Sequence, residues 1–146
     1  MTRTHDTATL GRHTNWNDRG LLLLRAAVGL VFLMHGGQKL FVFGHAGVTG
    51  FMSQIGLPFP GLNAWLITLV EFGGGLALLA GAQTRIAAAL LAFSMVVAIV
   101  SVHLASGFFA PAGFEYPLTL LLASLALAAT GAGRFSVDHA VGGRLA

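Results

Sequence analysis

LITLVEFGGGLALLAGA, at residues 66–82, is apolar on every side of a helix except at Glu71. A second stretch of this kind, IAAALLAFSMVVAIVSV, follows at residues 86–102. A helix of a water-soluble bundle carries polar residues on its outward face, and neither stretch has such a face. Both stretches are therefore predicted to cross a membrane.

The composition of the whole chain supports this prediction. Of the 146 residues, 55% are hydrophobic and 9% are charged, whereas soluble domains contain about 25% charged residues. The eight Lys and Arg residues are spread over tails and short loops, without the basic stripe of a nucleic-acid-binding protein. The absence of cysteine excludes disulfides and thiolate metal sites. Any redox chemistry must therefore use a bound cofactor, a quinone or a partner protein.

Four spans are predicted, because about 20 mainly apolar residues cross the roughly 30 Å of hydrocarbon in a bilayer. They cover residues 20–40, 62–82, 85–105 and 115–131. The predicted fold is an all-α membrane protein with a four-transmembrane-helix bundle at residues 20–133. Polar tails at residues 1–19 and 134–146 flank this domain.

The basic residues lie mainly on one side of the predicted bundle. The loops on the opposite side contain only Lys39, at the end of the first span. The positive-inside rule therefore predicts that the N and C termini are both cytoplasmic. The basic residues on the cytoplasmic side are Arg3, Arg12, Arg19, Arg85, Arg134 and Arg144.

The first outer loop has a helical pattern of its own. Val48, Phe51, Met52 and Ile55 recur at the spacing of one helix face, just before a Gly-Leu-Pro stop. This pattern indicates a short interfacial helix that lies on the outer face as a lid. A plain connecting loop is the alternative.

Arg25 and Glu71 are charged residues inside the first and second spans, where an unpaired charge is costly. Counted from the cytoplasmic ends of their spans, they lie about 8 Å and about 16 Å deep, a gap that an Arg side chain can bridge. We expect a structural ion pair between them. Both share their helix faces with small residues that allow close helix packing. Those residues are Gly29, Gly36, Gly74 and Gly75.

A second polar group is predicted near the outer face. His35 and His103 lie late in the first and third spans, each about 25 Å from the cytoplasmic side, which is also a faint sign of an internal two-helix repeat. Lys39 follows His35 by one turn, and Glu115 begins the fourth span at a similar level. These four residues form a candidate cofactor-binding pocket.

Three chemistries fit such a pocket. A quinone headgroup needs hydrogen-bond donors at its carbonyls and a proton route, which His, Lys and an acidic residue provide. Two His residues on different helices can instead bind haem iron axially. A zinc or iron site is conceivable from the two His and Glu115, but the ligands lack the spacing of a metal site on one helix, and no metal is predicted.

Six motifs occur in an order that resembles one family over nearly the whole chain after residue 19. They are LMHGGQKLF (33–41), GLP (56–58), LVEFGGGLALLAGAQTR (69–85), SVHLASGFF (101–109), GFEYPL (113–118) and GAGRFSVD (131–138), preceded by Arg25 and Gly29. Together they resemble the DoxX family of small four-span bacterial membrane proteins.

The resemblance implies a place in the bacterial cytoplasmic (inner) membrane and a link to redox chemistry. Subunits of this family are associated with a quinol oxidase and with thiosulfate:quinone oxidoreduction, and mycobacterial relatives are linked to a membrane complex that handles oxidative and thiol stress. The family pattern covers Arg25, His35, Lys39, Glu71, Arg85, His103, Glu115, Tyr116, Ser136 and Asp138.

The function expected from these observations is that of an accessory or quinone-interacting subunit of a membrane oxidoreductase complex, with no catalytic residue assigned. One alternative is a non-enzymatic membrane anchor or scaffold for a soluble redox or stress-response partner. Another is a carrier of a small lipophilic molecule, although four short helices offer little internal volume. The expected partners are the lipid bilayer and other subunits or further copies of the chain, but no nucleic acid.

Overall fold

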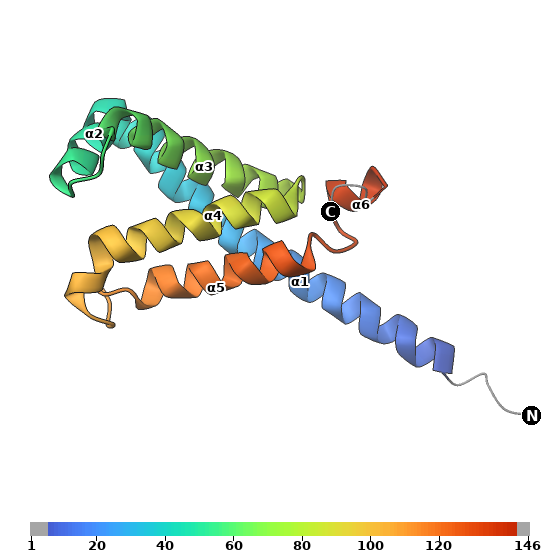
Figure 1. Cartoon of the computed structure of the whole chain (residues 1–146). Helices are drawn as coiled ribbons and strands as arrows, with labels where there is room; N and C mark the ends of the chain where they lie inside the picture. The colour runs from blue at the N-terminus through green and yellow to red at the C-terminus, as the bar shows by residue number, and fades with distance from the viewer. Residues whose placement is uncertain (1–5, 143–146) are drawn as a thin grey trace, which may run out of the picture.

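The computed structural model describes residues 6–142, with side chains from residue 16 onward, and all regular elements in this part of the chain are helices, joined by short loops (Figure 1). The α-helices are α1 (Asp6–Gly37), α2 (Gly44–Gln54), α3 (Pro60–Ala80), α4 (Thr84–Ala98), α5 (Glu115–Thr130) and α6 (Val137–Ala140). Two π-helical segments, η1 (Gln38–Phe43) and η2 (Ile99–His103), continue α1 and α4, and a short 3-10 turn, η3 (Leu104–Ser106), follows η2.

Within the described residues, three helical runs are long and apolar enough to cross a membrane. They are Trp16–Gln54, Pro60–Ala80 and Thr84–Ser106. α5 corresponds to the fourth predicted span, but its 16 residues extend only about 24 Å. α1 begins at Asp6, so most of the predicted N-terminal tail continues the first helix, where no proline interrupts it. Arg3 and Arg144, which entered the charge argument, lie outside the described residues.

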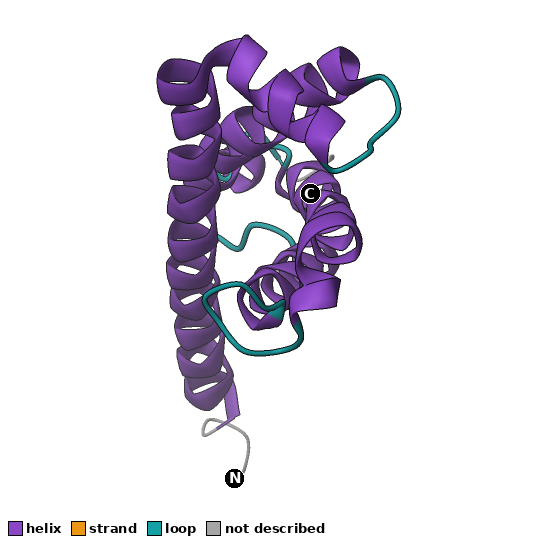
Figure 2. Cartoon of the chain, turned by 90° about the vertical axis from the view of Figure 1, so that its left-hand side faces the viewer, coloured by secondary structure: helices purple, strands orange, loops and turns teal. Residues whose placement is uncertain are grey.

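The helices form two antiparallel pairs. α1 packs most extensively on α3, and α4 packs on α5, while α3 joins the pairs by a smaller contact with α4. The ribbon of α1 runs apart from those of α4 and α5 (Figure 2), but Val28 and Phe32 of α1 belong to the same buried apolar cluster as Leu91 of α4 and Leu127 of α5. α6 lies at the end of the bundle where α1 begins (Figure 1). We call this end the inner end and the end that carries α2 the outer end.

Glycines set the close approach of α1 and α3. A Cβ atom on Gly75 would collide with the backbone nitrogen of Leu33, and one on Gly36 would collide with the backbone of Phe72. Gly29 lies against the same crossing, so its predicted role and those of Gly36 and Gly75 are confirmed. The fourth predicted glycine, Gly74, faces Leu91 of α4 instead.

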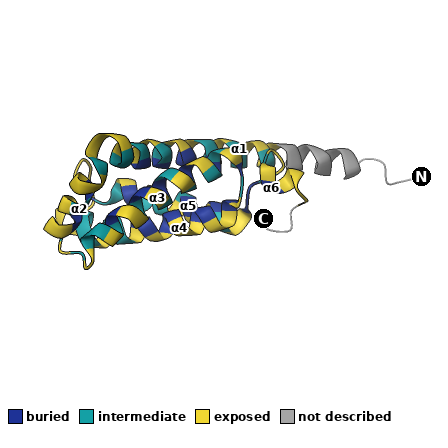
Figure 3. Cartoon of the chain, turned by 90° about the horizontal axis from the view of Figure 1, so that it is seen from above, coloured by how far each residue is buried: buried dark blue, intermediate teal, exposed yellow. Residues whose placement is uncertain are grey.

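The outward faces of the helices are apolar, and Figure 3 shows that exposed positions lie along each helix. Such a surface is stable only against lipid, because exposed apolar faces of this size are rare on soluble monomers. The bundle is therefore that of a membrane protein. The exposed residues include Leu23, Leu30, Leu69, Phe93 and Leu122.

The predicted short helix of the first outer loop is present as α2. Val48 and Met52 are buried against Ala64 of α3, whereas Phe51 is partly exposed. α2 continues directly from α1 through η1, so a plain connecting loop is the wrong alternative. It folds back over the outer half of α3.

Candidate functional site

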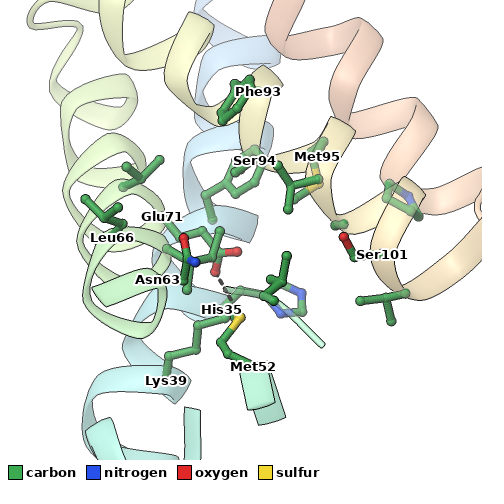
Figure 4. Close-up of a pocket in the computed structure, with 18 of the residues that line it drawn as sticks. His35, Lys39, Met52, Asn63, Leu66, Glu71, Phe93, Ser94, Met95 and Ser101 are labelled. Carbon is green, nitrogen blue, oxygen red and sulfur yellow. Dashed lines mark hydrogen bonds and ion pairs between the residues drawn. The ribbon is translucent and has the colours of Figure 1, made fainter. Parts of the chain in front are cut away.

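A cavity of about 510 Å³ lies between the outer halves of the helices, within the 300–1,000 Å³ typical of small-molecule sites. Its wall is mostly apolar and is formed by α1, η1, α2, α3, α4, η2 and α5. Figure 4 shows part of this wall, with Glu71 and Lys39 near one another and Ser94 and Ser101 on other elements. The polar residues that line the cavity are His35, Lys39, Asn63, Glu71, Ser94, Ser101, His103 and Tyr116.

An ion pair forms the most polar part of this wall. The Nζ atom of Lys39 in η1 lies 2.5 Å from Oε2 of Glu71 in α3. The Glu71 side chain is 6% exposed and that of Lys39 is 21% exposed. A buried carboxylate requires such a partner, because an unpaired charge in an apolar environment is strongly disfavoured.

The predicted ion pair of Arg25 with Glu71 is therefore wrong. The reason is the register of α1 against α3. Gly36 lies opposite Phe72, so Glu71 is level with the outer part of α1, where Lys39 is found. Arg25 lies level with Gly81, at the inner end of α3. The predicted depths of Arg25 and Glu71 were counted along each span separately, so they did not include the register between the two helices.

The two π-helical segments place polar residues at the cavity. η1 contains Lys39, and η2 contains Ser101 and His103. A π-turn inserts an extra residue into a helix and so rotates the side chains that follow, and such turns are frequent at functional sites. Their occurrence at the outer ends of both α1 and α4 also agrees with the faint two-helix repeat in the sequence.

Both predicted histidines line the cavity. His35 is exposed to the cavity from α1. The Nδ1 atom of His103 lies 2.8 Å from the carbonyl oxygen of Ala112, which fixes the ring orientation. With Nδ1–H donating to this carbonyl, Nε2 of His103 is an acceptor in the neutral ring and a donor in the protonated ring. The structure thus brings His35, Lys39 and His103 into one cavity, as the sequence predicts.

Glu115 does not line this cavity. Its Oε1 atom accepts a hydrogen bond of 2.8 Å from the backbone N–H of Ala110, within the loop that leads into α5. The next two residues, Tyr116 and Pro117, line the cavity instead. One residue corresponds to about 100° of helix rotation, and depth alone does not specify that rotation. Glu71, which had been assigned to the other pair, supplies the acidic group of the pocket.

A second polar centre lies at the inner end. Arg25 is 1% exposed and donates hydrogen bonds of 2.5 Å to the carbonyl oxygens of Ala132 and Phe135. Asp138, also buried, accepts hydrogen bonds from the backbone N–H groups of Gln83 and Thr84 at the start of α4. The GAGRFSVD motif thereby joins α1 to the α3–α4 turn, and we call this set of contacts the inner clamp.

The sequence did not predict the hydrogen bonds of Asp138, although the family pattern included this residue. Ser136 accepts a hydrogen bond from the backbone N–H of His139 and so caps α6. The Ser-x-Asp pattern was a usable signal for this cap. The partners of Asp138, at residues 83 and 84, are too distant in sequence for any local pattern to reveal.

Comparisons with known proteins find similar membrane proteins. The DoxX family model matches residues 20–104. "Putative oxidoreductase CatD" of Bacillus subtilis is 38% identical over 119 residues, covering 82% of this chain and 84% of the relative. "Inner membrane protein YqjF" of Escherichia coli is 36% identical over 124 residues, covering 84% and 92%. "Uncharacterized membrane protein Rv3486" of Mycobacterium tuberculosis is 35% identical over 130 residues, covering 82% and 79%. No solved structure matches the chain.

Proposed function

The chain belongs to the DoxX family of membrane proteins, and from this premise we propose that it is a subunit of a membrane oxidoreductase complex whose cavity binds the headgroup of a quinone. The main support is the composition of the cavity wall, which combines an ion pair, two His residues and a few neutral polar residues with a mostly apolar surface. The name of the Bacillus subtilis relative supports the oxidoreductase class.

The arrangement of donors fits a quinone headgroup. Such a ring has flat apolar faces and a carbonyl acceptor at each of two opposite edges. His35 and Lys39 come from the first helical run, and Ser101 and His103 come from η2. Donors on separate elements can hold the two carbonyls, while Phe32 and other apolar lining residues contact the faces.

The ion pair also provides a proton route. When a quinone is bound and reduced by the redox cofactor of a partner subunit, protons are added at its carbonyl oxygens. Lys39 can donate a hydrogen bond from Nζ to one of these oxygens and transfer that proton, and the buried carboxylate of Glu71 orients Nζ. His35, exposed in the cavity, can return the proton to Lys39 from the aqueous side.

We also propose that both termini are cytoplasmic and that the cavity lies in the outer half of the bacterial cytoplasmic membrane. At the inner end, Arg134 contacts Asp18, the neighbour of Arg19, and Arg85 lies beside Gly131 at the end of α5, whereas Lys39 lies in η1, next to α2 at the outer end. Fusions that report a periplasmic location should be active after His45 or Gly107 and inactive after Arg85. An active fusion at Arg85 would overturn this orientation.

Purification from native membranes tests the quinone proposal directly. We expect an organic extract of the purified protein to contain quinone, and titration of the quinone-free protein with a prenylated naphthoquinone to show saturable binding. A Soret band in the visible spectrum would replace the proposal with haem bound by His35 and His103. Neither quinone nor haem, together with no binding, would favour the role of a non-enzymatic anchor for a soluble partner.

The cavity volume also favours a second candidate, a carrier of a small lipophilic molecule, because a single chain encloses more space than four short helices suggested. The two candidates differ in their need for a redox partner. A carrier should move a labelled quinone between vesicles without any change in the oxidation state of the quinone. A fixed subunit should move no quinone between vesicles.

A further inference from the structure

Several residues that line the cavity are also exposed, among them Phe51 of α2, Tyr116 of α5 and three apolar residues of α3 and α4. Leu66 of α3 is 51% exposed, and Leu90 and Phe93 of α4 are 49% and 68% exposed. The exposure of these three residues on the cavity wall indicates that the cavity is open beside them. These residues therefore form the rim of an opening between α3 and α4, which we call the α3–α4 opening.

The α3–α4 opening faces the hydrocarbon of the bilayer. Leu66 lies about 9 Å along α3 from Pro60, and Phe93 lies about 14 Å along α4 from Thr84. Both positions are well inside the roughly 30 Å of hydrocarbon. The α3–α4 contact is also smaller than the contacts of α1 with α3 and of α4 with α5.

The polar and apolar parts of the cavity are separated. Lys39 and Glu71 lie where α1 faces α3, and His35 faces the cavity from α1, whereas all three rim residues are apolar. A ligand that fills this space has a polar end beside the ion pair and an apolar part beside the rim.

We infer that the ligand carries an apolar chain, and that this chain leaves the cavity through the α3–α4 opening while the headgroup stays beside Lys39 and Glu71. This inference rests on the proposed function and extends it from a headgroup to a ligand class, quinones with an isoprenoid tail. The tail remains in an apolar environment along its whole length, so the ligand can enter from the bilayer without passing through water.

Matched tryptophan variants test this route. Leu66→Trp and Leu90→Trp each place a larger side chain at the α3–α4 opening, one on α3 and one on α4. Leu69→Trp and Ile86→Trp are the controls, because they are exposed on the same helices but do not line the cavity. The probes are a methylnaphthoquinone with a geranyl chain and the same methylnaphthoquinone without it, with affinities measured by titration calorimetry in detergent.

We expect each rim variant to weaken binding of the geranyl compound about tenfold, equivalent to about 1.4 kcal/mol, and to leave the affinity for the tailless compound unchanged. The control variants should bind both compounds like the wild type. Equal losses for both compounds, or no loss in either rim variant, would overturn the route while leaving quinone binding intact. Failure of the wild type to bind either compound would overturn the proposed function itself.

Discussion

Lys39 contacts Glu71 across the α1–α3 interface, with 2.5 Å between Nζ and Oε2, and Arg25 takes no part in this pair. The contact lies beside the glycines that bring the two helices together, and its two residues line the cavity. The pair therefore connects helix packing with the chemistry of the cavity.

The first prediction concerns the strength of this pair. Lys39→Ala or Glu71→Ala alone should lower the free energy of unfolding by about 3 kcal/mol, because each leaves a partner unpaired in an apolar environment. The double variant should lose less than the sum of the two losses. Denaturation in detergent, followed by circular dichroism, measures all three.

The matched control is the cycle of Arg25→Ala with Glu71→Ala. These residues share no hydrogen-bond partner, so their losses should add to within about 0.5 kcal/mol. A larger coupling for Arg25 with Glu71 than for Lys39 with Glu71 would contradict the observed pairing.

The second prediction concerns the inner clamp. Arg25→Ala leaves the carbonyl oxygens of Ala132 and Phe135 without their donor and should cost about 3 kcal/mol. Arg25→Lys should recover only part of this loss, because one ammonium group cannot match the guanidinium fork. Amide exchange should rise at residues 132–138 in both variants, as measured by mass spectrometry.

Arg19→Ala is the control for the clamp, because Arg19 is exposed on the same helix. It should change stability by less than about 0.5 kcal/mol. Unchanged exchange at residues 132–138 in Arg25→Ala would show that Arg25 does not hold this segment.

The third prediction compares the effects on stability of alanine substitutions at two glycines of α3, Gly75 and Gly73. Gly75→Ala adds a Cβ atom that collides with the backbone of α1, so it should push α1 and α3 apart and lower the midpoint of thermal unfolding. Gly73→Ala meets no atom within 4 Å and should raise stability by up to about 1 kcal/mol, because alanine favours helix more than glycine does. Similar effects of the two substitutions would contradict the close approach at Gly75.

Hydropathy alone was sufficient to predict most of the helices, because a span must satisfy its backbone internally and present an apolar surface. It could not define where α1 begins, since Asp6 lies in a polar but helix-compatible segment. The amphipathic spacing of Val48 and Met52 correctly indicated α2. The π-helical segments had no recognisable signal in the sequence.

The site was predicted only in part, because depth is one of three coordinates of a side chain in a helix bundle. Depth was sufficient to group His35, Lys39 and His103. It did not include the rotation of a helix about its axis, which directs Glu115 to the loop. Depth also does not specify the register between the helices, which places Glu71 beside Lys39.

The last prediction tests the histidines. If they hold a quinone headgroup, His35→Ala and His103→Ala should each weaken quinone binding about tenfold or more, in line with the loss of about 1.4 kcal/mol from one hydrogen bond. His35→Ala should leave stability unchanged, whereas His103→Ala should cost about 1 kcal/mol through the contact with Ala112.

His45→Ala is the control, because His45 is exposed near the outer end and does not line the cavity. Glu115→Gln keeps the acceptor for Ala110 and, because Glu115 does not line the cavity, should leave quinone binding unaltered. Calorimetric titration and thermal unfolding give both quantities for each variant. Wild-type affinity in the double variant His35→Ala/His103→Ala would show that the headgroup does not contact these residues, and a joint loss of stability and binding in His35→Ala would assign that residue a structural role.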